Sequence, residues 1–328
     1  MFVTFEDYDS LIVKVMYTHK SVSVKDYFAL ICSRLETAGK LSTCRNYRNT
    51  YRSFSKFEGE NSFMMQDLSP ELLFQYNCYL YNSGSVRNTV SFYNRILRAV
   101  YNRAAKEGIV PYENRLFADV YTGIDKTSKR ALDLMSLQQI VSLDLSAEPE
   151  LAFTRDLFLF SIYARGMCFV DMAHLTHDNI CLKKGEIDYV RSKTGQRLCV
   201  KLEPCMVAII ERYYRLCYDN YVFPIIQNGD PARAFKDYEY QLQRHNLLLK
   251  EIGARCHIPF QLSTLTARHS WATMARNADV PISVISAGMG HTSEKTTRIY
   301  LADLDQGLID AANRTVIDRL MRDRKVQS

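Results

Sequence analysis

The sequence predicts a mainly α-helical protein with two domains, a small helical domain followed by a larger, mainly helical domain that contains a small β-hairpin or sheet. Apolar residues recur at three- and four-residue spacing through most of the chain, and only one pair of segments alternates as strands do. The 328 residues are 47% apolar, which can fill two buried cores. A chain of this length suits two domains of roughly 150 residues each.

Four helices are expected in the first third of the chain. The first begins after Ser23, the second runs from about Ser42, and the third starts at Ser69-Pro70, where the fixed φ of proline suits the first helical position. The fourth ends at Gly108. Its apolar stripe consists of Val90, Tyr93, Leu97, Val100, Tyr101 and Ala104.

The remainder of the chain is expected to be mainly helical around one hairpin. Residues 185–190 and 197–202 alternate apolar and polar side chains on either side of a polar turn, which places Lys193 at the tip. Helices should follow from about Glu203, Pro231, Ser263, Pro281 and Ser293, with a last amphipathic helix from about Asp303 to Arg322. The chain thus divides into an N-terminal extension (1–19), a helical domain (20–110), a linker with little periodicity (111–130) and a second domain (131–328).

The net charge of +6 is distributed unevenly. Residues 20–106 hold 13 Lys and Arg against 6 Asp and Glu, whereas all other residues together hold 29 against 30. A basic helical face can lie on a phosphate backbone, although an ordinary solvated helix has the same composition. The candidate DNA-binding residues are Arg45, Arg48, Arg52, Arg87, Arg95 and Arg98.

The composition argues against several other classes of protein. Nine dispersed cysteines without a C-x-x-C pair favour a reducing cytoplasm and no zinc site. Asp171, His174 and His177 recur every three residues, but the run breaks and no fourth ligand is evident, so no metal is expected there. No segment approaches the roughly 18 apolar residues of a membrane helix, and the N-terminus lacks the pattern of a signal peptide. Neither a membrane partner nor export is therefore expected.

The densest functional motif lies near the C-terminus. Arg268-His269 stands on a predicted helix, and Gly290-His291 is followed by Thr296-Thr297 and, nine residues after the histidine, by Tyr300. In these residues the chain resembles the tyrosine recombinase (phage integrase) family, whose signature has the same order and the same histidine-to-tyrosine spacing. The resemblance spans nearly the whole chain. It implies a SAM-like core-binding domain that grips DNA, followed by a catalytic domain with the DNA breaking-rejoining enzyme fold.

The resemblance also implies a catalytic set of Arg165, Lys193, Arg268, His291 and Tyr300. Tyr300 would attack the scissile phosphate and form a 3′-phosphotyrosyl link. The two arginines and His291 would stabilise the charge of the transition state, and Lys193 would protonate the departing 5′-oxygen. Because the new link conserves the energy of the phosphodiester, no metal, ATP or other cofactor is required.

Two positions depart from the family pattern. Where the family usually has a histidine three residues before the second arginine, this chain has Leu265. Three residues after the first arginine the family usually has an acidic residue, and this chain has Cys168 there. Asp171, one turn further on, can supply the missing carboxylate. His269 faces elsewhere on its helix than Arg268, so we expect it to support the site rather than to react.

The function implied by the resemblance is site-specific recombination, by which DNA is integrated, excised or inverted. It would take place on double-stranded DNA, within a tetramer whose protomers exchange their C-terminal segments. Accessory DNA-bending proteins would be further partners. The expected location is the bacterial nucleoid in the cytoplasm. Two alternatives stay open. One is an enzyme like a type IB topoisomerase, which relaxes DNA without synapsis. The other is a catalytically impaired DNA-binding relative, which Leu265 would explain.

Overall fold

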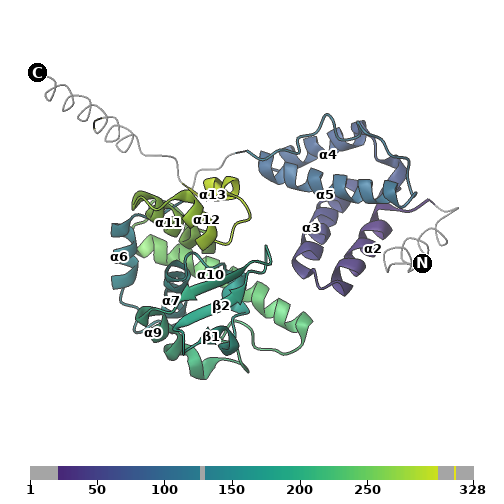
Figure 1. The fold of residues 1–328 in the computed structure, drawn as a ribbon. Coiled ribbons are helices and arrows are strands. Elements are labelled where there is room, and N and C mark those ends of the chain that lie inside the picture. Colours follow the sequence, from purple (N-terminus) through teal and green to yellow (C-terminus); the bar gives the residue numbers. More distant parts are fainter. Residues whose placement is uncertain (1–20, 126–129, 302–313, 315–328) are drawn as a thin grey trace, which may run out of the picture. The chain divides into compact units, whose positions relative to one another are not determined.

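The computed structural model describes residues 21–125, 130–301 and 314, which belong to two compact units, Met1–Thr127 and Ser128–Ser328 (Figure 1). Both units are mainly helical, and the second contains one small sheet, as predicted. The expected N-terminal extension and almost all of the expected last helix lie outside the described residues. Within the described ranges no helix is both long and apolar enough to cross a membrane.

The described part of the first unit is a helical bundle whose helices begin where the sequence signals predict. The Ser23 and Ser69 side chains accept hydrogen bonds from the backbone N–H groups of Asp26 (3.0 Å) and Leu72 (3.2 Å), which caps two of the helices. Its elements are α2 (Val24–Thr37), α3 (Leu41–Glu58), η1 (Met65–Asp67), α4 (Pro70–Asn82) and α5 (Arg87–Lys106).

The core of the first unit extends beyond its last helix. Leu116, Phe117 and Val120, from the stretch expected to be a linker, are buried in the same cluster as Phe28 and Leu97. Isolated apolar residues in a segment without periodicity do not show in advance that the segment packs on a neighbouring bundle. Within this stretch, residues 111–120 therefore contribute to the first unit.

The second unit holds the sheet and a set of helices around it (Figure 1). Its described helices before the sheet are α6 (Leu134–Ser142), α7 (Pro149–Tyr163), α8 (Phe169–Ala173) and η2 (His177–Asn179). Those after it are α9 (Pro204–Tyr213), η3 (Tyr214–Leu216), α10 (Pro231–Arg255), α11 (Thr264–Asn277), α12 (Ile282–Gly288) and α13 (Glu294–Tyr300).

The sheet has three antiparallel strands in the order β1 (Ile180–Cys181), β2 (Glu186–Val190) and β3 (Arg197–Lys201). Val190 pairs with Arg197, so residues 191–196 form the connecting loop and Lys193 lies within it, as the alternating pattern predicts. Strand β1 was not predicted, because two residues are too few to show an alternation.

Helix α7 is the central helix of the second unit. It contacts α9, α10 and α11, and its apolar residues are buried on nearly every side, as in a helix that is enclosed by its neighbours. It ends at Tyr163, so its C-terminus places Arg165 at the edge of this core.

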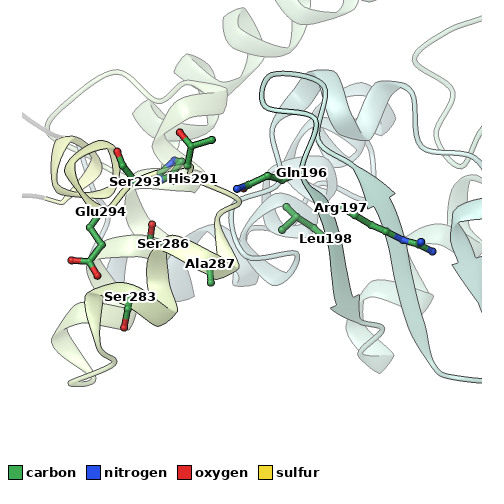
Figure 2. A pocket seen from close by; sticks show the side chains of 10 residues that line it. Gln196, Arg197, Leu198, Ser283, Ser286, Ala287, His291, Ser293 and Glu294 are labelled. Atoms are coloured by element: carbon green, nitrogen blue, oxygen red, sulfur yellow. The ribbon is translucent and has the colours of Figure 1, made fainter.

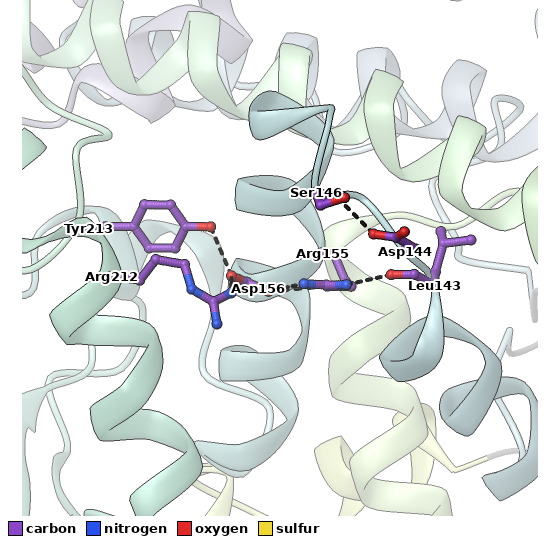
Figure 3. A network of polar contacts seen from close by, with 7 residues as sticks. All are labelled: Leu143, Asp144, Ser146, Arg155, Asp156, Arg212 and Tyr213. Atoms are coloured by element: carbon purple, nitrogen blue, oxygen red, sulfur yellow. Dashed lines mark hydrogen bonds and ion pairs between the residues drawn. The ribbon is translucent and has the colours of Figure 1, made fainter.

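A buried carboxylate fastens α7 to its neighbours (Figure 3). The Asp156 side chain is only 4% exposed, and it accepts hydrogen bonds from the Tyr213 hydroxyl (2.8 Å) and from the Arg212 and Arg155 guanidiniums. Arg155 also donates to the Leu143 carbonyl oxygen (2.6 Å) after α6. Burial and the neighbouring Asp156 carboxylate raise the pKa of Tyr213, so its hydroxyl stays a donor. The cluster ties α6, α7 and α9 together.

We expect Asp156→Ala to lower the free energy of unfolding by about 3 kcal/mol, because it leaves the partly buried Arg155 and the Tyr213 hydroxyl without their acceptor. Asp188→Ala is the matched control. Its partner Arg197 is 74% exposed, so this change should cost about 0.5 kcal/mol. Urea unfolding followed by circular dichroism measures both. Equal losses of unfolding free energy in the two variants would show that the buried cluster stabilises the fold no more than an exposed ion pair does.

Candidate active site

Arg165 stands just after α7 in a backbone conformation that is unusual for its residue type. Its φ of 58° lies in the left-handed region, and Gly166 follows with a φ of 73°. A residue with a Cβ pays on the order of 1 kcal/mol to adopt this conformation, so its presence here points to a functional constraint. The half-buried Arg165 side chain donates to the Cys199 carbonyl oxygen (3.2 Å), which links the end of α7 to β3.

Arg268 is the centre of the site. It lies on α11, which begins with a capping box between Ser263 and Thr266, and it is 2% exposed. Its guanidinium donates to the Gly166 carbonyl oxygen (2.6 Å), to the Met289 carbonyl oxygen (2.6 Å) and to His291 Nε2 (2.9 Å). One side chain therefore joins α11 to the end of α7 and to the turn at residues 289–291, three segments that are far apart in the sequence.

Gly166 is needed for this close approach. A Cβ added there would lie 3.0 Å from both Cα and Cγ of Arg268, and the left-handed φ disfavours any other residue as well. The absence of a side chain at Gly166 lets the end of α7 pack directly on Arg268.

His291 follows a turn at Gly290, whose φ is 63°, and is 6% exposed. Because a guanidinium can only donate, Nε2 must accept from Arg268, and the ring proton lies on Nδ1, 2.9 Å from the Thr297 hydroxyl. Burial, together with the cations Arg268, Arg191 and Lys193, lowers the pKa of His291 to about 3. The imidazole is therefore neutral at neutral pH.

The loop that carries Lys193 lies against this turn. The Arg191 guanidinium and the Thr194 hydroxyl (3.2 Å) both donate to the Gly290 carbonyl oxygen. The Ser192 N–H donates to Asp171 Oδ1 (2.9 Å). Lys193 itself is exposed, and its charge is close enough to lower the pKa of His291.

A hollow of about 530 Å³ opens beside His291. Figure 2 shows its two walls, with Gln196 and Leu198 of the hairpin on one side and Ser286 and Ala287 of α12 on the other. His291 lines the hollow on the same side as α12, so the site is open to a ligand that runs between the hairpin and α12.

The structure thus gathers four of the five residues predicted to do the chemistry: Arg165, Lys193, Arg268 and His291. The fifth, Tyr300, is the last residue of α13, and only its backbone is described. It follows Thr297 by about one turn, so the helix that holds His291 through Thr297 also carries Tyr300.

The residues expected to support the site have different surroundings. Asp171 is buried and anchors the Lys193 loop at Ser192. His269 is 7% exposed and lies on α11, whereas Leu265, near the start of the same helix, is 47% exposed. The three contacts given above for Arg268 come from other parts of the chain, so Arg268 is held in place without a histidine at position 265.

Arg191 and Thr194 were not anticipated as parts of the site. The sequence did contain one indication for Arg191. Every second side chain of a strand lies on the same face, and Arg191 follows Ile187 and Tyr189 on the buried face of β2. A cation at a position whose side chain should be buried indicates a specific partner, which proves to be Gly290.

The predicted DNA-binding arginines all lie on α3 and α5, and four of them are exposed. Arg48 pairs with Glu36 (2.6 Å), and Arg87 pairs with Asp125 (3.4 Å) and stacks over the Tyr121 ring. The exposed ones are Arg48, Arg52, Arg87 and Arg98, and the half-buried ones are Arg45 and Arg95.

Among the described residues, no three His, Cys, Asp or Glu side chains are grouped as metal ligands would be.

Two buried histidines make stability depend on pH. Burial lowers the pKa of His245, which packs on Phe169, to about 3, close to that of His291. Both values lie below the ordinary pKa near 6.5, so the unfolded chain takes up protons first as the pH falls. Each histidine therefore contributes stability above pH 6.5 that is lost progressively as the pH falls towards 3.

We expect His245→Leu to reduce this loss of stability by about 2 kcal/mol between pH 6.5 and 4.5. Urea unfolding at a series of pH values measures it, and the same change at the exposed His174 is the control. Parallel curves for wild type and His245→Leu would contradict the expectation.

Both units match the profiles of known protein families. The profile described as "Phage integrase SAM-like domain" matches residues 23–116, and the profile described as "Phage integrase family" matches residues 132–306, more than half of the chain. A curated tyrosine recombinase of Thermosipho africanus is 23% identical over 279 residues, which cover 83% of this chain and 93% of the relative.

Two solved structures have a similar fold. A lambda integrase tetramer bound to a Holliday junction is 13% identical, with a TM-score of 0.61, and the match covers 91% of this chain and 86% of that one. The Tn1549 transposon integrase in complex with a circular intermediate DNA is 16% identical, with a TM-score of 0.61, and the match covers 90% of this chain and all of that one.

Proposed function

The chain belongs to the phage integrase family of tyrosine recombinases, and from this premise we propose that it is a site-specific recombinase that cuts and rejoins DNA through Tyr300. The observation that carries the proposal is the joining of Arg268 to His291 (2.9 Å), with the end of α7, the Lys193 loop and the start of α13 around this pair. These are the groups that a transesterification at phosphorus needs.

The cations of the site suit a phosphate whose charge grows in the transition state. Arg165 and Arg268 carry fixed, forked donors that can meet the non-bridging oxygens of a phosphodiester. The Arg268 side chain is already held by the Gly166 and Met289 carbonyl oxygens, so little reorganisation is required when the phosphate arrives. When DNA is bound, the neutral His291 can contribute one further hydrogen bond.

In the proposed step, the Tyr300 phenol loses its proton to solvent and its oxygen forms a bond to the phosphorus. The bond from phosphorus to the 5′-oxygen breaks, and the Lys193 ammonium gives that oxygen a proton. The products are a 3′-phosphotyrosyl link and a free 5′-hydroxyl. A 5′-hydroxyl from a second strand can reverse the step and exchange partners.

The first unit is the proposed DNA grip. Exposed arginines on α3 and α5, among them Arg52 and Arg98, can contact the phosphate backbone of double-stranded DNA, and the binding should weaken as salt is raised. As in the lambda integrase tetramer on a Holliday junction, we propose that four protomers act together, with exchange of their C-terminal segments. Accessory DNA-bending proteins can assist, and the place of action is the bacterial nucleoid.

The test is strand exchange. Cognate DNA is first obtained by selecting covalent complexes from random duplexes that carry a nick at a fixed position. Two duplexes of different length that bear the selected site are then incubated with the protein, and a duplex with a scrambled site is the control. We expect recombinant products of two new lengths with the selected site and none with the scrambled one.

The same assay separates the rival functions. Relaxation of supercoiled plasmids without recombinant products would identify an enzyme like a type IB topoisomerase. Binding without any covalent complex would identify a catalytically impaired relative. Either result would overturn the proposal.

A further inference from the structure

Arg191 is a buried cation and the first residue of the loop that carries Lys193. It is 2% exposed, and its guanidinium donates to the Gly290 carbonyl oxygen. Within the described part of the chain, no carboxylate forms an ion pair with Arg191, and its buried Nε has no hydrogen-bond partner. Burying an unpaired guanidinium costs free energy, so a structural role alone explains it poorly.

Contacts on both sides of Lys193 hold the loop in place. Arg191 and Thr194 (3.2 Å) donate to one acceptor, the Gly290 carbonyl oxygen, from the two flanks of the loop. Ser192 N–H is bound by the buried Asp171 (2.9 Å). Lys193, by contrast, is exposed, so the loop is fixed at its base while the side chain at its tip faces outward.

The acceptor of these contacts adjoins the other half of the site. Gly290 directly precedes His291, which is bound to Arg268 and Thr297. A Cβ at Gly290 would lie 3.2 Å from the Arg191 side chain, so the turn and the arginine are packed in direct contact. A displacement of Arg191 would therefore separate the Lys193 loop from the His291 turn.

We propose that Arg191 is a positioning residue, which fastens the Lys193 loop to the Gly290–His291 turn so that Lys193 is in place when the scissile phosphate binds. The inference rests on the proposed function and assigns a role that neither the motif nor the comparisons give to this residue. Thr194 is the second, weaker fastener. A misplacement of about 1 Å can slow general-acid catalysis roughly 10²-fold. The contacts of Arg191 and Thr194 with Gly290, which we call the clamp, therefore directly affect the chemical step.

The first arm of the test needs no DNA. Amide hydrogen exchange is measured in the full-length wild type and in Arg191→Gln, Arg191→Lys and Thr194→Val. We expect the Ser192 amide to exchange at least tenfold faster in Arg191→Gln. The effect should be smaller in Arg191→Lys, which keeps a cation at this position, and in Thr194→Val, which keeps Arg191 itself. Unchanged exchange in Arg191→Gln would overturn the clamp whether or not the protein recombines DNA.

The second arm measures single-turnover cleavage with two leaving groups. One substrate has the natural 5′-oxygen, and in the other sulfur replaces it, because a thiolate leaves without protonation. With oxygen we expect Arg191→Gln to be about 10²-fold slow, while its affinity for DNA stays within about twofold of wild type. With sulfur it should come within about threefold of wild type, as should Lys193→Ala.

A double-mutant cycle completes the second arm. Arg191→Gln added to Lys193→Ala should slow the oxygen substrate no further, since both changes remove the same proton donor. Arg215→Gln, at an exposed arginine of the same unit, is the matched control. Equal defects on oxygen and sulfur, or additive losses in the cycle, would overturn the proposal, whereas a wild type that forms no covalent complex refutes the proposed function instead.

Discussion

Replacing Tyr300 by phenylalanine is expected to abolish the covalent protein–DNA complex. The change removes the single oxygen that would attack phosphorus, and no neighbouring group on α13 offers a comparable nucleophile, since the residues before it are Thr, Arg and Ile. The loss should be at least about 10⁴-fold, down to the limit of detection, with DNA binding retained. A nicked duplex from which the 5′ fragment diffuses away traps the complex for measurement on a denaturing gel.

The matched control for this change is Tyr240→Phe, because Tyr240 lies on α10 and is 64% exposed. It should form the covalent complex at the rate of wild type. Persistence of the complex in Tyr300→Phe would mean that the nucleophile is another residue, and the assignment of α13 as the nucleophile helix would be wrong.

The second large effect is expected for Arg268→Lys. A lysine keeps the positive charge, but its single ammonium cannot reach the Gly166 carbonyl, the Met289 carbonyl and His291 with the planar fork that the guanidinium uses. Both the donors to the phosphate and the placement of His291 are lost, so we expect single-turnover cleavage to fall at least about 10³-fold.

Stability must be followed in the same variant, because Arg268 also joins three segments of the second unit. Thermal unfolding shows how much of the protein remains folded at the assay temperature, and Arg215→Lys, at an exposed site, is the control. Cleavage by folded Arg268→Lys within tenfold of the wild-type rate would contradict the central role given to this guanidinium.

Much of the fold could be predicted because local signals agree with it. Ser23 and Ser69 cap the helices that they were expected to start, and the alternation of residues 185–190 with 197–202 predicts the β2–β3 hairpin. The strand β1 and the packing of Leu116 on the first core depend on tertiary contacts, which leave no periodic trace in so few residues.

Motif order predicts which residues form the site but not how they are arranged. It predicts Arg165, Lys193, Arg268 and His291. The structure adds that Arg268 joins the segment after Arg165 to His291, and that the Lys193 loop is attached next to His291, at Gly290. It could not be read from the sequence that His291 is neutral, since its pKa depends on burial and on three cations from elsewhere in the chain.

The charge of the first unit is likewise modified by structure. Its excess of basic residues suggests that every arginine is free to contact DNA phosphates. However, Arg48 and Arg87 are partly neutralised by ion pairs with Glu36 and Asp125. Such exposed pairs are worth less than about 1 kcal/mol, so a phosphate can displace the carboxylates when DNA binds.

The central claim, that this chain breaks DNA by forming a bond to Tyr300, is tested most directly by locating that bond. The trapped complex is digested with protease and nuclease, and the modified peptide is sequenced by mass spectrometry. We expect a nucleotide joined through its 3′-phosphate to Tyr300 and to no other residue. A nucleotide on a different side chain, or no modified peptide from cognate DNA, would contradict it.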